Sequence, residues 1–233
     1  MLEATDSNVL SMLPKVVLAI GGLGTAAYGI VDATKAFGGG ISNRGFGDIK
    51  KVISKFIPAS ANGSGSVLAL TSALATLRAN WLNGMALADQ KAVAKALIKL
   101  NLTPASANGM AGVTGVDSAL LTSVAGKLGT GAPLTQEETD VYGRFDLLLT
   151  SVLDQGYQRG DQRYRNSAKL LAVPIAVGLA LLGSVAMGHG CLKCIDALKA
   201  CAAGLLATPL APVAKDLASA IQAGAKVAQS WKR

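Results

Sequence analysis

The stretch from Leu170 to Gly188 contains 19 residues and no charged or strongly polar side chain. A transmembrane helix needs about 20 mostly apolar residues to cross the hydrocarbon core of a bilayer. Inside that core every backbone N–H and C=O must be satisfied within the segment, so a spanning segment is helical. Cations and amphipathic aromatics, typical of a membrane surface, precede it at Tyr157, Arg159, Arg163, Tyr164, Arg165 and Lys169. The sequence therefore predicts a transmembrane helix over residues 168–190.

A second apolar segment runs from Val16 to Val31, near the start of the chain. Its 16 residues would form a helix of only about 24 Å. Apolar residues before Lys15 extend it to a second candidate span if that side chain snorkels to the interface. Small residues spaced four apart let helix backbones approach closely in a membrane. The predicted helix-packing positions of this kind are Gly22, Ala26, Ala180 and Ser184.

The composition also favours a helical membrane protein. Only 15% of the residues are charged, against about 25% in soluble domains, and 51% are apolar. The net charge is +8, but the cations cluster beside the apolar segments and form no single stripe among aromatics. We therefore expect membrane lipids as partners and no nucleic acid.

A glycine-rich linker from Gly38 to Gly47 leads into a short basic helix. One face of this helix carries Ile49, Val52, Ile53, Phe56 and Ile57, and the lysines lie opposite. Beside a span, such a helix is predicted to lie on anionic lipid; the alternative is a core helix with a solvated basic face. The residues predicted to bind the membrane surface are Lys50, Lys51, Lys55, Arg159, Arg163, Arg165 and Trp231.

The segment PASANG occurs twice, at residues 58–63 and 104–109. Over residues 58–83 and 104–129, 13 of 26 aligned positions are identical. Proline interrupts helices and Asn-Gly suits a turn with positive φ, so each copy predicts a helix end, a loop and a new helix. The repeats, near 58–103 and 104–150, therefore predict a duplicated helical-pair domain.

A capping-box pattern at Thr135 and Glu138 predicts that a helix begins near Gln136. No proline follows before the apolar stretch, although Gly156 and Gly160 interrupt the pattern, so the helix is expected to continue into it. The carboxylates of this helix are expected to form a solvated face. Two residues spaced four apart, Asp161 and Arg165, are expected to pair.

The single histidine and the three cysteines all follow the long apolar stretch. Four such ligands can bind zinc, but their spacing lacks the paired knuckles of zinc sites. We expect no metal and no cofactor, and interpret the cysteines as the buried stripe of a helix, with thiol lipidation as another alternative. The less favoured metal-ligand candidates are His189, Cys191, Cys194 and Cys201.

The region from Ala200 to Ala214 is uncharged but contains Pro209 and Pro212. Because proline removes a helical hydrogen bond, we expect a re-entrant or packed segment here and no third span. It belongs to a C-terminal helical tail over residues 191–233.

The predicted fold is all-α, a membrane-anchored helical protein with a duplicated helical-pair domain between two apolar segments. Residues 1–37 form an N-terminal segment with a candidate transmembrane helix, and residues 38–57 form the linker and basic helix. Residues 58–167 form the duplicated domain, followed by the span over 168–190 and the tail over 191–233.

With one histidine and no nucleophile in a recognisable motif, the sequence favours a non-enzymatic protein. The predicted function is a membrane scaffold that assembles as a homo-oligomer, with other membrane proteins as further partners. The positive-inside rule places residues 38–167 in the cytoplasm, at a bacterial inner membrane. The alternatives are an oligomeric pore or channel and a soluble all-helical binding protein.

Overall fold

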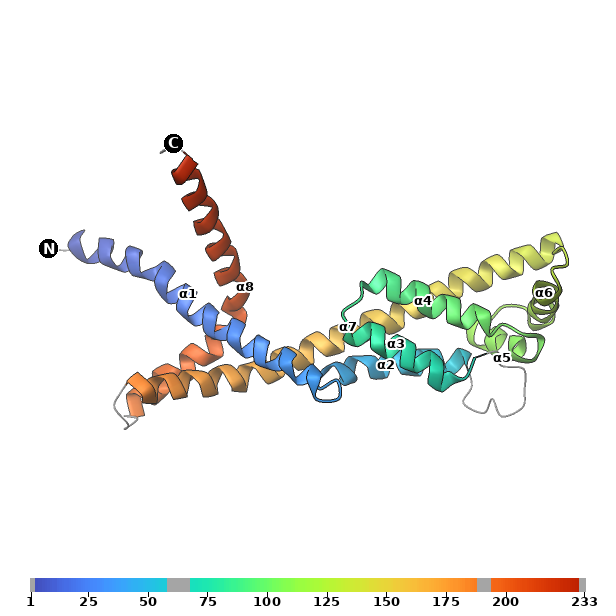
Figure 1. Cartoon of the computed structure of the whole chain (residues 1–233), viewed down its shortest axis with the longest axis horizontal. Helices are drawn as coiled ribbons and strands as arrows, with labels where there is room; N and C mark the ends of the chain where they lie inside the picture. Colours follow the sequence, from blue (N-terminus) through green and yellow to red (C-terminus); the bar gives the residue numbers. More distant parts are fainter. Residues whose placement is uncertain (1–2, 58–67, 188–193, 231–233) are drawn as a thin grey trace. The chain divides into compact units, whose positions relative to one another are not determined.

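The computed structural model describes the backbone of residues 3–57, 68–187 and 194–230, and it contains no strand within these ranges. The all-α prediction is confirmed. The helices are drawn in Figure 1: α1 (Glu3–Ala33), the short 3-10 helix η1 (Thr34–Ala36), α2 (Ser42–Phe56), α3 (Leu70–Leu82), α4 (Leu87–Leu100), α5 (Pro104–Thr114), α6 (Ser118–Thr130), α7 (Gln136–Met187) and α8 (Cys194–Ser230).

The chain forms two compact units, and α7 contributes residues to both. Residues 39–165 form one, here called the helical unit, which holds α2 to α6 and the first part of α7. Residues 1–38 and 166–233 form the other, here called the apolar unit.

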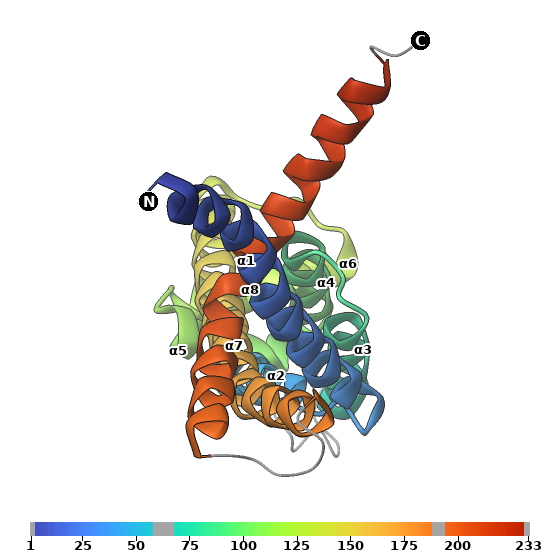
Figure 2. The same cartoon turned by 90° about the vertical axis from the view of Figure 1, so that its left-hand side faces the viewer.

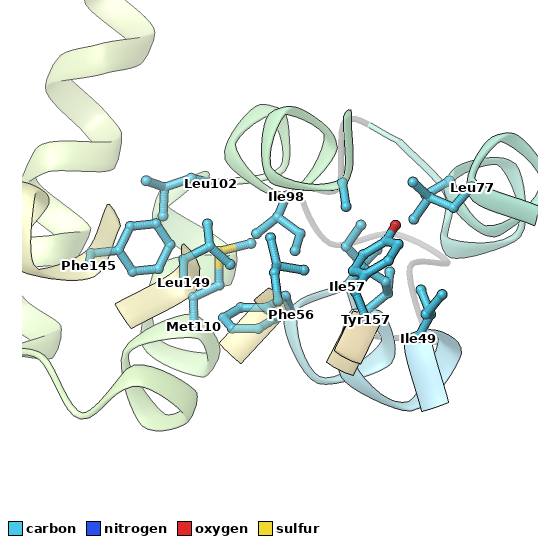
Figure 3. Close-up of a cluster of buried hydrophobic side chains, with 14 of the residues drawn as sticks. Ile49, Phe56, Ile57, Leu77, Ile98, Leu102, Met110, Phe145, Leu149 and Tyr157 are labelled. Atoms are coloured by element: carbon cyan, nitrogen blue, oxygen red, sulfur yellow. The ribbon is translucent and has the colours of Figure 1, made fainter. Parts of the chain in front are cut away.

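The core of the helical unit is made of side chains from α2, α3, α4, α5, α6 and α7, part of which Figure 3 shows. Its fully buried members include Ile49, Ile53, Phe56, Ile57, Leu77, Ile98, Met110, Leu121, Phe145, Leu149, Leu153 and Tyr157. The Tyr157 hydroxyl donates a hydrogen bond of 3.3 Å to the backbone oxygen of Gln90. Burial raises the pKa of Tyr157, so the phenol remains a neutral donor.

The basic amphipathic helix is α2, and its apolar face is not available to lipid. Ile49, Ile53 and Phe56 are each 1% exposed and lie in the core of the helical unit. The prediction that this face lies on a membrane is therefore wrong, and the alternative of a core helix is the one observed. These three nonpolar side chains can enter one core because they recur at the period of the helix.

Glycines bring α2 and α7 unusually close together. A Cβ atom placed on Gly160 would stand 2.8 Å from the backbone oxygen of Gly45, and one on Gly45 would stand 2.6 Å from that of Gly160. A Cβ on Gly156 would stand 2.7 Å from Val52 Cγ2. The glycines that interrupt the apolar pattern of α7 therefore mark the positions where a neighbouring helix packs against it.

The predicted start of α7 is confirmed, with a capping box formed between Thr135 and Glu138. The Thr135 N–H donates to Glu138 Oε2 at 2.7 Å, and the Glu138 N–H donates to Thr135 Oγ1 at 3.3 Å. The ammonium of Lys127 at 2.6 Å and the hydroxyl of Ser123 also donate to this buried carboxylate. Lys127 first, then Ser123 and the Thr135 backbone, lower the pKa of Glu138 to about 2.

The second PASANG copy is not a loop. Thr103 caps α5, its side chain accepts from the Ser106 N–H, and Pro104 occupies the first turn, where its missing N–H costs nothing. Asn108 and Gly109 lie inside α5, so the turn predicted at this copy is wrong. The first copy, residues 58–63, lies outside the described residues.

The two copies of the sequence repeat do not bury equivalent positions. At the offset of 46 residues, α2 aligns with α4, and most of α3 aligns with α6. The buried residues of α3 are Ala73, Leu77 and Trp81, and those of α6 are Leu121, Val124 and Ala125. These positions do not coincide at that offset, so the two helices turn different faces to the core. The duplicated helical pair stays a prediction.

The apolar unit contains α1, the end of α7 and α8, and three helices of the described chain are long and apolar enough to cross a membrane. Their ranges are Met12–Ala36, Gln136–Met187 and Ile195–Ala220. The third was not expected as a span because of Pro209 and Pro212, but α8 continues through both prolines, so the segment is not re-entrant. Ala207, Ala211 and Ala214 of this segment are buried, as its alternative interpretation as a packed segment predicts. Figures 1 and 2 show that α8 bends part-way along, as expected for a helix that contains prolines.

Candidate membrane helices and basic groove

Close contact between α1 and α8 depends on two glycines of α1. A Cβ on Gly21 would stand 2.1 Å from Ala214 Cβ, and one on Gly24 would stand 2.0 Å from the backbone oxygen of Ala207. In Figures 1 and 2 the two helices cross at an angle. Because no side chain intervenes, their backbones can touch, which is how helices associate in lipid.

The predicted packing positions of α1 do not take part in this contact. Gly22 and Ala26 are exposed, and a Cβ on Gly22 would meet nothing within 4 Å. Within the chain α8 covers another face of α1, because the buried positions of α1 among its described side chains are Gly21, Gly24, Ala27 and Val31. Spacing alone identified a small-residue helix but not which of its faces is covered.

The end of α7 also packs on α8. A Cβ on Gly204 would stand 2.5 Å from Val177 Cα. The other two predicted packing positions, Ala180 and Ser184, line a recess of about 570 Å³ among α1, α7 and α8. Side chains of all three helices therefore surround this recess, with Leu23 on α1 and Ala203 on α8.

The exposed cations of the helical unit gather along α2 and α7. Lys51, Lys55 and Arg159 line a recess of about 180 Å³ with Asp48, Val52, Val152, Gln155 and Gly156, here called the basic groove. Figure 1 shows that α2 lies along α7. The structure thus brings together three of the predicted membrane-surface residues, from segments more than a hundred positions apart in the sequence.

The other predicted surface residues are placed separately. Arg163 Nη1 lies 3.1 Å from Asp48 Oδ1, and Arg165 Nε lies 2.7 Å from Asp161 Oδ2, which confirms the expected pairing with Asp161. Lys50 is exposed but does not line the groove. Trp231 lies outside the described residues.

The sequence reasoning missed the carboxylate and the glycine of the groove. Asp48 precedes Lys51 by three positions, which is one helical turn, and that spacing was an available signal. Gly156 was interpreted only as an interruption, since the sequence does not show that α2 packs there.

The acidic residues of α7 are not simply solvated, contrary to the expectation. Asp146 lies 2.6 Å from Lys95 Nζ and 2.5 Å from Lys99 Nζ, and Asp154 pairs with Lys91. Burial opposes the charge of Asp146, but these lysines outweigh it and lower its pKa. Burial likewise opposes the charge of Lys99, while Asp146 and the nearby Tyr142 raise its pKa. These contacts join α4 to α7.

The metal-ligand candidates receive no support from the described residues, among which no cluster of three His, Cys, Asp or Glu side chains occurs. Cys201 is a free thiol of intermediate exposure on α8. His189 and Cys191 lie outside the described residues, and Cys194 begins α8.

The chain was compared with protein-family models, curated proteins and solved structures, and no match was found in any of the three.

Proposed function

We propose that this chain is an integral membrane protein whose three apolar helices cross the bilayer and whose helical unit acts as a scaffold. The observation that carries the proposal is the packing of α1 on α8 through Gly21 and Gly24, within helices that still expose large apolar side chains. Leu170, Leu182 and Leu198 are 74%, 68% and 71% exposed. Such helices suit hydrocarbon better than water.

The third crossing changes the proposed topology of the tail. With three crossings, residues after Ala220 lie on the same side as residues 39–165. That side then gains Lys226, Lys232 and Arg233, while Lys193 precedes α8 and Lys199 lies in its first two turns, at the opposite end of this crossing. The positive-inside rule therefore favours a cytoplasmic helical unit and C-terminus, at a bacterial inner membrane.

Self-assembly is proposed through the uncovered face of α1. Gly22, Ala26 and Gly29 are exposed at helical spacing, and a Cβ on either glycine would meet nothing within 4 Å. A second copy could approach this face as α8 approaches the opposite one. The proposed scaffold is a homo-oligomer without a catalytic role.

Insertion is tested by expressing the full chain and washing the membranes with alkaline carbonate. The chain is expected to stay in the pellet and to leave it only with detergent. Recovery in the carbonate supernatant would contradict the proposal. Labelling of single cysteines in a cysteine-free background, at positions 140 and 229, should occur from the same side.

Assembly is tested by light scattering of the detergent-solubilised protein. The wild type is expected to be oligomeric, and Gly22→Ile with Ala26→Ile is expected to shift it to monomer. Ala202→Ile is the control, because Ala202 is an exposed alanine on α8. A monomeric wild type, or an equal effect of the control, would contradict assembly through this face.

A further inference from the structure

Three cations, Lys51, Lys55 and Arg159, line the basic groove. No ion pair among the described residues involves Lys51, Lys55 or Arg159. Lys51 and Lys55 are four residues apart on α2, so their like charges repel across one helical turn. Arg159 adds a third positive charge from α7. An anion bound between them would relieve this repulsion.

The groove is a formed recess. Gly156 on α7 and the side chains of Val52 and Val152 provide apolar surface, and the Gln155 amide adds a hydrogen-bonding group. An anion there would be partly shielded from water, which strengthens its attraction to nearby cations. The planar guanidinium of Arg159 can bind two phosphate oxygens at once, and each lysine offers a compact charge.

Asp48 is the one acidic residue of the groove, and its charge is compensated. Its Oδ1 lies 3.1 Å from Arg163 Nη1. Its Oδ2 is buried and has no hydrogen-bond partner in the described structure. Because Arg163 pairs with Asp48, the three other cations that line the groove leave it with an excess of positive charge.

We propose that the basic groove binds the phosphate group of an anionic ligand, through Lys51 and Lys55 of α2 and Arg159 of α7. An anionic phospholipid headgroup, such as that of phosphatidylglycerol, supplies such a phosphate group. The lipid as source rests on the proposed membrane location, whereas the phosphate chemistry does not.

The test uses the full chain in a neutral detergent and isothermal titration calorimetry. The probes are dihexanoyl phosphatidylglycerol, dihexanoyl phosphatidylcholine and inorganic phosphate, each at low and high salt. The test variant is Lys51→Gln, Lys55→Gln and Arg159→Gln together. The charge-matched control is Arg44→Gln, Lys50→Gln and Arg144→Gln, three exposed cations that do not line the groove.

Phosphatidylglycerol is expected to bind the wild type more tightly than phosphatidylcholine, and the test variant at least 10-fold more weakly than the wild type. The control is expected to bind like the wild type. Tighter binding of inorganic phosphate would support the phosphate site and assign it a soluble ligand. Equal weakening in both variants, or no binding of any probe, would overturn the proposal. Circular dichroism of both variants verifies that they remain folded.

The outcome separates the two proposals. If the test variant loses phosphate binding in detergent, the phosphate site is supported even if carbonate releases the chain from membranes. Conversely, if the chain resists carbonate but binds no phosphate, the proposal of membrane insertion is supported and the proposal of a phosphate site in the basic groove is contradicted.

Discussion

Gly24 of α1 and Ala207 of α8 meet so closely that a Cβ atom on the glycine would stand 2.0 Å from the alanine's backbone oxygen. Only glycine permits this approach, and Gly21 permits the neighbouring one against Ala214. At these two positions the contact between α1 and α8 is therefore made by backbone and small side chains.

Gly24→Ala is expected to lower the thermal midpoint of the detergent-solubilised protein, because the added methyl group must push α1 away from α8. Overpacking of this kind costs about 1–3 kcal/mol. Gly22→Ala is the matched control, since a Cβ there meets nothing within 4 Å. The midpoint is followed by circular dichroism, and equal midpoints for the two variants would contradict the α1–α8 contact.

In the helical unit, Gly160→Ala is expected to destabilise the packing of α2 on α7 by about 1–3 kcal/mol, because the new methyl would lie against the backbone of Gly45. Gly143→Ala, on the same helix but in open space, should instead stabilise by about 0.5–1 kcal/mol through helix propensity. Chemical denaturation of both variants measures the change in the free energy of unfolding, which should have opposite signs in the two. A stabilising Gly160→Ala would show that the two backbones are farther apart.

The capping box makes the stability of the folded chain depend on pH. Because the pKa of Glu138 falls from 4.5 to about 2 in the folded chain, the folded state favours the carboxylate form. This contribution is fully present above pH 4.5 and is lost as the pH falls toward 2. Glu138→Gln should therefore lower the unfolding midpoint at pH 7, and the difference from wild type should shrink on acidification. Glu137→Gln, at the adjacent exposed position, should leave the midpoint nearly unchanged at both pH values.

Asp146→Asn is expected to destabilise the α4–α7 contact by about 1 kcal/mol, because it leaves Lys95 and Lys99 without their carboxylate. Combining it with Lys95→Gln and Lys99→Gln should recover part of the loss, and the mutant cycle measures this coupling. The coupling should fall at high salt. Asp140→Asn, at an exposed position of the same helix, is the control, and absence of coupling would contradict the ion pairs.

Local patterns predicted much of the fold. The capping box fixed the start of α7 at Gln136, and the helical spacing of Ile49, Ile53 and Phe56 predicted α2. The pattern did not reveal whether that apolar face meets protein or lipid, because both environments select the same side chains. The second PASANG copy was misjudged because Asn-Gly favours a turn only when the preceding cap does not commit the chain to a helix.

The sequence predicted the cationic residues of the candidate site but not that they lie together in one groove. Lys51, Lys55 and Arg159 were named from charge beside apolar segments, whereas the groove that unites them exists because α2 packs on α7 at Gly156. Small residues were equally visible at Gly21 and Gly22, and spacing could not decide between adjacent registers.

The sequence by itself determined the all-α fold of the described residues, the start of α7, the charge distribution and the long apolar segments, since these follow from local periodicity, capping and composition. Only the tertiary structure decided that α8 continues through its prolines, that Gly21 and Gly24 form the packed face of α1, and that one groove gathers the cations. Those outcomes depend on which backbone surfaces approach one another, and that information resides in contacts between distant segments.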